Sequence, residues 1–163
     1  MKKLCIVLLC GLLAGCEYTV PLVKAPTLDI DNAVVGLWQR TTKNGQKEQL
    51  LVIPLDSKEY LVSYPSESDE AMFARGCLAT VGGMTLVQLK WFGTAQAAIP
   101  DDNRLYQYAS YKVEGEKLTV HLLSSDVISK EIASTEALVK AIEANKSATN
   151  LFRENMVFTK IKK

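Results

Sequence analysis

Two side chains of this sequence, the thiol of Cys77 and the imidazole of His121, have the reactivity that nucleophilic catalysis requires. Enzymes of that class place a nucleophile beside a histidine base, which a third group orients. Here His121 is the one histidine, Asp126 is the first acid after it, and no Gly-x-Ser-x-Gly elbow occurs. Strand alternation turns His121 to solvent if Val120 and Leu122 face the core. We therefore predict a protein that is not an enzyme and a Cys77 that is a small buried hydrophobe. A Cys77–His121 pair that the fold brings together is the catalytic alternative.

Acidic residues gather in three short segments, each of which could bind a cation or form a catalytic pair. The segment Asp29-Ile30-Asp31-Asn32 has the first acids of a calcium loop, but the glycine and the distal glutamate are missing. One histidine and one free thiol are too few for a usual zinc centre. Asp101-Asp102 and the pair Glu114 and Glu116 are typical of a solvated loop and a hairpin turn. The sequence therefore predicts no metal, no cofactor and no glycosidase pair.

The most specific chemistry of the sequence is at its N-terminal end. Lys2 and Lys3 precede an apolar run over 4–13, and Ala14-Gly15 then lead into Cys16. Charge, an apolar run of this length and small residues are typical of a secretory signal. With a cysteine in that place, the segment resembles the lipobox of bacterial lipoproteins. The resemblance implies a signal peptide over 1–15 and a Cys16 that carries a diacylglycerol and an N-acyl chain such as palmitate.

Acylation of Cys16 would determine where the protein resides. Two acyl chains already anchor a protein firmly in a membrane, so three would hold it essentially permanently. In lipoproteins of this type an aspartate after the cysteine often retains the protein in the inner membrane, and Glu17 stands there instead. We therefore expect a lipoprotein that is lipid-anchored in the bacterial cell outer membrane and faces the periplasm.

Removal of residues 1–15 changes the composition of the chain. It takes away Lys2, Lys3, Cys5 and Cys10, and leaves 148 residues with 17 basic and 18 acidic side chains. A near-neutral chain argues against nucleic acid as a partner, because that partner requires a basic surface. With Cys16 acylated, no disulfide can form within the mature chain. A chain of this length buries about two-thirds of its unfolded surface, which is enough for one domain.

Beyond residue 33 the sequence consists of short apolar runs separated by turn residues. Asn44-Gly45, Gly82-Gly83 and Gly115 are typical of hairpin turns, which need positive φ. The segment over 16–33 contains two prolines and is predicted to be a tether from the lipidated cysteine, part of which packs on the domain. A single β-rich domain is predicted over 34–163, with strands over 34–42, 49–55, 59–64, 72–81, 84–92, 105–113 and 117–124.

One segment has helical rather than strand periodicity. Over 134–145, Ser134 or Thr135 can cap a helix whose apolar face carries Leu138 and Ile142. A last strand is expected over 155–161. We therefore predict a mostly β protein, an antiparallel up-and-down barrel or a strongly curved sheet of about eight strands, with one helix before the last strand. Pairing of the final strand with the first would remove both exposed edges.

The start of the first predicted strand has a short motif, Gly36-Leu37-Trp38. It resembles the Gly-x-Trp that opens many lipocalins. The resemblance implies a lipocalin-like barrel in which Trp38 plugs the closed end beneath a basic residue of the last strand, either Arg153 or Lys160. An open β-sheet with a helix is the rival fold.

The predicted function follows from the fold, because no catalytic motif is present. A closed barrel of eight strands is either filled by side chains or holds one small ligand. We predict non-catalytic binding of a small apolar ligand, with Trp38, Trp91, Tyr106 and Tyr108 as its contacts. Tyr106 and Tyr108 share one face of a strand and carry polar tips. The alternative is an envelope interaction or assembly protein whose surface binds a protein partner.

Overall fold

The chain forms a closed antiparallel barrel in the computed structural model, which describes residues 18–66, 69–100 and 104–162. Each strand pairs with the next along the chain, and the last pairs with the first, as Trp38↔Lys160 shows. The strands are β1 (Gly36–Thr41), β2 (Lys47–Pro54), β3 (Glu59–Tyr64), β4 (Met72–Val81), β5 (Met84–Thr94), β6 (Tyr106–Glu114), β7 (Lys117–Leu123) and β8 (Phe152–Lys160). The predicted barrel is confirmed, and the rival open sheet is excluded.

The predicted strands agree with the structure except near their ends. The glycines of three hairpins have positive φ: Gly45 at 79°, Gly82 and Gly83 at 58° and 82°, and Gly115 at 59°. The last strand starts at Phe152, three residues before the predicted start at 155. Phe152 pairs with Leu123 at the end of β7, so pairing across the barrel extends the strand.

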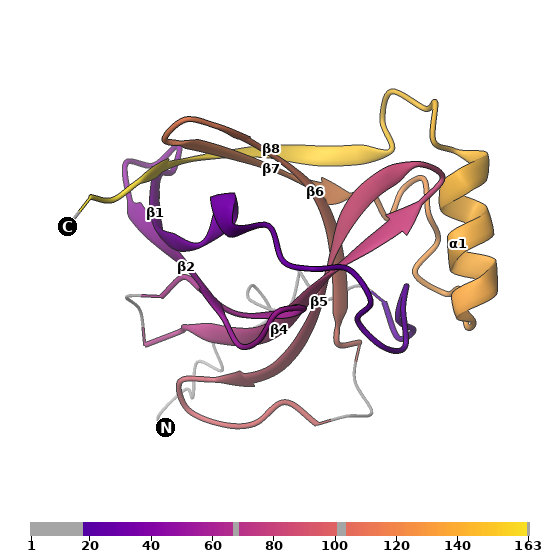
Figure 1. Ribbon diagram of the computed structural model, residues 1–163, viewed down its shortest axis with the longest axis horizontal. Coiled ribbons are helices and arrows are strands. Elements are labelled where there is room, and N and C mark those ends of the chain that lie inside the picture. Colours follow the sequence, from indigo (N-terminus) through magenta and orange to yellow (C-terminus); the bar gives the residue numbers. More distant parts are fainter. Residues whose placement is uncertain (1–17, 67–68, 101–103, 163) are drawn as a thin grey trace, which may run out of the picture.

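The one predicted helix is present as α1 (Thr135–Ala144). The hydroxyl of Ser134 accepts a hydrogen bond from the backbone N–H of Ala137 at 3.1 Å, which caps the first turn. The side chains of Leu138 and Ile142 pack against the barrel and are fully buried. Figure 1 shows α1 at one end of the molecule beside the β4–β5 hairpin, with the C-terminus at the other end.

Two apolar cores occupy the two faces of the barrel wall. Cross-strand pairs alternate between them: Leu78↔Val87 faces the barrel interior, and the next pair, Ala79↔Leu86, faces outward. The outer core is covered by α1 and by the N-terminal segment, so residues of both faces are buried. Its buried members are Tyr18, Leu22, Ala79, Val81, Leu86, Tyr108, Leu123, Ile128, Leu138, Ile142 and Leu151.

The segment over 18–34 lies along the barrel, and we call it the N-terminal strap (Figure 1). Tyr18 and Leu22 are buried in the outer core, with 1% and 3% of their surfaces exposed. The strap ends in a 3-10 turn, η1 (Asn32–Val34), whose Val34 enters the interior core. The described part of the predicted tether is therefore packed on the barrel. The predictions for residues 1–15 and for Cys16 fall outside the described residues.

Candidate functional site

The barrel interior contains a cavity of about 90 Å³. Every strand from β2 to β7 contributes to its wall, and Val34 of η1 adds a lining side chain from the strap. The wall is made of aliphatic side chains and two tyrosines: Val34, Leu50, Val52, Tyr60, Val62, Leu78, Val87, Leu89, Ala109, Tyr111, Leu118 and Val120. One water molecule fills about 10–15 Å³ of such a cavity, so there is room for roughly six to nine groups of that size.

Strand periodicity explains why these side chains meet. Leu50 and Val52 are two apart on β2, as are Val87 and Leu89 on β5, so each pair shares one face. Leu118 and Val120 are likewise two apart on β7, and both line the cavity, so Val120 faces the core as the outward orientation of His121 requires.

The strap is fastened over the interior by two tyrosine hydroxyls. The Tyr60 hydroxyl accepts a hydrogen bond from the backbone N–H of Asp31 at 2.6 Å, and the Tyr111 hydroxyl donates to Asp31 Oδ2 at 3.0 Å. Burial raises the pKa of both tyrosines, and the carboxylate of Asp31 raises that of Tyr111 further. Both hydroxyls of the cavity wall are thus engaged with the strap, so the cavity offers a ligand mainly apolar contact. Asp31 Oδ1 also accepts a hydrogen bond from the Ala33 N–H at 2.9 Å, which caps η1.

Trp38 and Lys160 form the stack that the Gly-x-Trp motif implied. Lys160 Nζ lies 5.0 Å from the centroid of the Trp38 ring, so the basic residue is Lys160 rather than Arg153. The indole N–H donates to Val34 O at 2.8 Å, and the ring is fully buried. Gly36 has φ +138°, and a Cβ built there would lie 2.9 Å from Lys160 Cε. The motif therefore favours glycine chiefly because of this positive φ, and the absence of a Cβ also leaves room for the lysine.

None of the four predicted ligand contacts lines the cavity. Tyr106 and Tyr108 belong to the outward face of β6, where Tyr108 is buried in the outer core and Tyr106 packs against it. Trp91 faces inward and is buried, but its indole N–H bonds Gln107 Oε1 at 3.3 Å. The lining aromatic of β6 is Tyr111, an odd number of positions from Tyr108. The sequence could not select between these faces, because both carry aromatic side chains.

A polar cluster lies on the same barrel face as the cavity residues. Arg40 Nε donates to Glu48 Oε2 at 2.7 Å, and the Tyr64 hydroxyl donates to the same oxygen. The Arg40 guanidinium also lies 5.6 Å from the ring centroids of Tyr64 and Phe158. Burial and the bond to Glu48 raise the pKa of Tyr64. Sequence reasoning missed this cluster, which joins side chains of three consecutive strands, β1, β2 and β3, with Phe158 of the distant β8.

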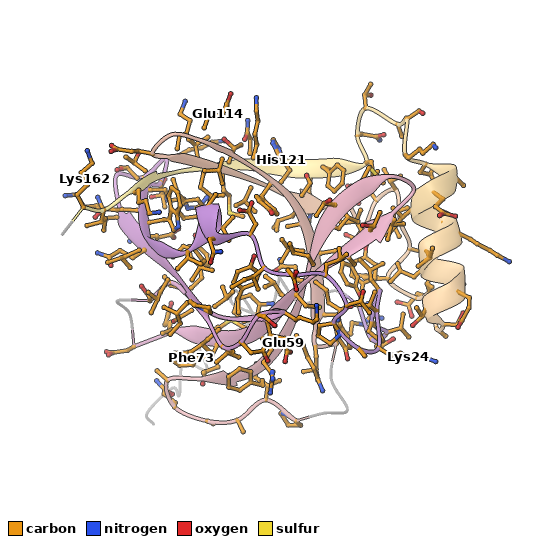
Figure 2. The ribbon with its side chains drawn as sticks, viewed as in Figure 1. Lys24, Glu59, Phe73, Glu114, His121 and Lys162 are labelled. Atoms are coloured by element: carbon orange, nitrogen blue, oxygen red, sulfur yellow. The ribbon has the colours of Figure 1, made fainter. Side chains whose placement is uncertain are left out.

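The two candidate catalytic side chains, Cys77 and His121, belong to β4 and β7, which are not neighbours in the barrel. Cys77 is buried on β4, and burial raises the pKa of its thiol to about 11, which disfavours the reactive thiolate. Gln88 Nε2 lies 3.7 Å from its Sγ. His121 belongs to the other face of β7 from Leu118 and Val120 and points away from the barrel in Figure 2. The predicted positions of both residues are confirmed.

The outer wall of β2 and β3 carries a partly exposed apolar strip made of Leu51, Ile53 and Leu61. Ile53 and Leu61 are cross-strand partners, and Leu51 is two residues from Ile53 on the same face. Ile53 is 38% exposed. No helix in the described part of the chain is both long and apolar enough to cross a membrane.

Comparisons with known proteins identify no relative. No protein-family model, no curated protein and no solved structure matches this chain. Any inference about function therefore rests on the barrel and its cavity.

Proposed function

We propose that the protein binds a small apolar ligand inside its barrel without catalysis, as a lipocalin does. The observation that carries this proposal is the apolar cavity at the centre of the barrel. The volume of this cavity limits the size of the ligand. Drug-sized ligands occupy pockets of about 300–1,000 Å³, whereas this cavity suits a short hydrocarbon chain or the end of a longer one.

The location that we propose for this binding is the bacterial outer membrane, facing the periplasm. Acyl chains on Cys16 would anchor the domain there, as the lipobox-like segment ending at Cys16 indicates. An anchored barrel of this kind would take up hydrocarbon close to the lipids that supply it.

The test uses a series of primary alcohols from six to twelve carbons, titrated into the unlipidated domain and followed by methyl NMR. Each buried methylene contributes about 0.8 kcal/mol, so affinity should rise about four-fold per carbon. The rise should stop near eight carbons, where the cavity is full. Binding that is absent, or that shows no chain-length limit, would contradict the proposal.

A matched pair of variants places the ligand. Val87→Phe fills the cavity and should lower affinity at least ten-fold, whereas Val157→Phe changes an exposed valine of β8 and should leave it unchanged. If Val87→Phe does not fold, Ala109→Leu tests the same wall with a smaller addition. Equal affinity in the cavity and surface variants would show that the alcohol binds elsewhere.

A second candidate function is binding of an envelope protein, which the apolar strip of Leu51, Ile53 and Leu61 favours. A photo-crosslinking side chain at Ile53 should then capture one defined partner in cells, and one at His121 should not. Equal crosslinking at both positions, or none, would remove this candidate.

A further inference from the structure

Tyr18, the first described residue, is fixed to the barrel by both its backbone and its side chain. Its N–H donates to Tyr106 O at 3.1 Å and its carbonyl accepts from Tyr106 N–H at 3.0 Å. The Tyr18 hydroxyl donates to Ile128 O at 2.9 Å, and the ring centroid lies 5.1 Å from that of Tyr108. The position of the chain at Tyr18 is therefore set by the fold.

This fixed position leaves almost no free chain between the domain and the proposed lipid anchor. Cys16 is two residues before Tyr18. A fully extended chain spans at most about 3.6 Å per residue, so their Cα atoms are within about 7 Å of each other. A bilayer that holds acyl chains on Cys16 must come equally close to the barrel surface around Tyr18.

The surface around Tyr18 has the chemistry of a headgroup-contacting face. The Trp91 N–H donates to Leu105 O, so β5 runs antiparallel beside the residues that lead into β6. Phe92 and Arg104, one position further along each segment, are therefore neighbours. Phe92 is 43% exposed, and Arg104 forms an exposed ion pair with Glu131. Exposed aromatic and basic side chains together suit the interface between headgroups and acyl chains. Lys130 and Glu131 are exposed and lie two and three residues after Ile128, whose carbonyl accepts the hydrogen bond of the Tyr18 hydroxyl. We call Phe92, Arg104, Lys130 and Glu131 the anchor face.

We propose that the anchor face rests directly on the lipid headgroups, so that the barrel is seated on the membrane in one fixed orientation. The proposal depends on the acylation of Cys16 and adds a second contact to it. The strap holds the lipidated end of the chain at a fixed place on the barrel, and the partner of the anchor face is the bilayer itself.

The orientation is testable because β6 runs away from the anchor face. Glu114 is eight residues from Tyr106 along that strand, which is about 26 Å. Figure 2 shows Glu114 on the opposite side of the molecule from Lys24 of the strap. A fluorophore at Ser129→Cys and one at Glu114→Cys therefore report the near and the far end.

The experiment uses the full-length lipidated protein in vesicles whose lipids carry a headgroup quencher. A seated barrel should show at least three-fold stronger quenching of the label at position 129 than of the label at 114. A variant with 20 Gly/Ser residues inserted between Glu17 and Tyr18 should lose this difference, because such a linker spans about 25 Å. Equal quenching at both positions in the parent chain overturns the proposal.

Two further measurements separate the anchor from the seating. Labelled palmitate should be incorporated into the parent chain and not into Cys16→Ser. No labelling of the parent chain would refute both the anchor and the seating. Labelling together with equal quenching at positions 129 and 114 would refute the seating alone. Phe92→Ser should weaken the quenching at position 129. Val157→Ser, an equally exposed apolar residue on β8, should not. Equal effects of the two serine variants would contradict the assigned face.

Discussion

Replacement of Leu22 by alanine tests whether the strap is part of the folded domain. The Leu22 side chain is 3% exposed and lies in the outer core, and its backbone N–H donates to Gln88 Oε1 at 2.6 Å. Burial of a leucine side chain contributes about 1.5–3 kcal/mol, and the space left by truncation adds to the loss. Because the strap can partly relax into that space, we expect Leu22→Ala to lower the free energy of unfolding by about 2–3 kcal/mol.

The assay is guanidinium unfolding of the unlipidated domain, followed by the fluorescence of Trp38 and Trp91. Leu55→Ala is the matched control, because Leu55 is 46% exposed and should change stability by less than about 0.5 kcal/mol. A flexible tether would make the two variants equal. Stability of Leu22→Ala within 0.5 kcal/mol of the parent would refute the rigid strap and, with it, the fixed position of Tyr18.

Three further outcomes are expected. Gly36→Ala should lower the free energy of unfolding by about 1–3 kcal/mol, because the φ of +138° is strained for alanine and the added Cβ would displace the Lys160 side chain. Thermal unfolding measures the loss, and an unchanged Tm would contradict it. Tyr111→Phe removes a hydrogen bond to the Asp31 carboxylate and should lower the free energy of unfolding by about 1.5–3 kcal/mol. Amide hydrogen exchange should become faster at η1 and stay unchanged at α1. The raised pKa of Cys77, about 11 instead of 9.0, means that its stabilising contribution is complete below pH 9 and is lost as the pH rises to 11. The parent chain should lose up to about 3 kcal/mol more than Cys77→Ala over that range, and parallel pH profiles would contradict the burial of the thiol.

Most of the strands and the helix could be predicted from local sequence. Apolar runs of strand length ended at Asn44-Gly45, Gly82-Gly83 and Gly115, where positive φ is required. Ser134 and the spacing of Leu138 and Ile142 gave the helix within one residue at either end. These signals are local because turns, caps and periodicity each involve residues close together in the chain.

The candidate site was predicted less well, because it depends on contacts between distant residues. The aromatic residues of β6 lie on both faces, so the sequence could not show that Tyr111 faces the cavity while Tyr108 faces the outer core. The strap was predicted to be mainly a tether because its two prolines and weak periodicity indicate no regular element. Its burial comes from bonds to partners such as Gln88, which is 66 residues from Leu22.

The sequence by itself determined an antiparallel β protein of about eight strands with a capped helix and a Gly-x-Trp motif. Only the tertiary structure decided that Lys160 covers Trp38, that the strap is fixed and that the barrel contains an apolar cavity. A strand pattern specifies two faces but not what covers each of them. The coverage, and the volume left unfilled, depend on how the closed barrel brings side chains together across its whole circumference.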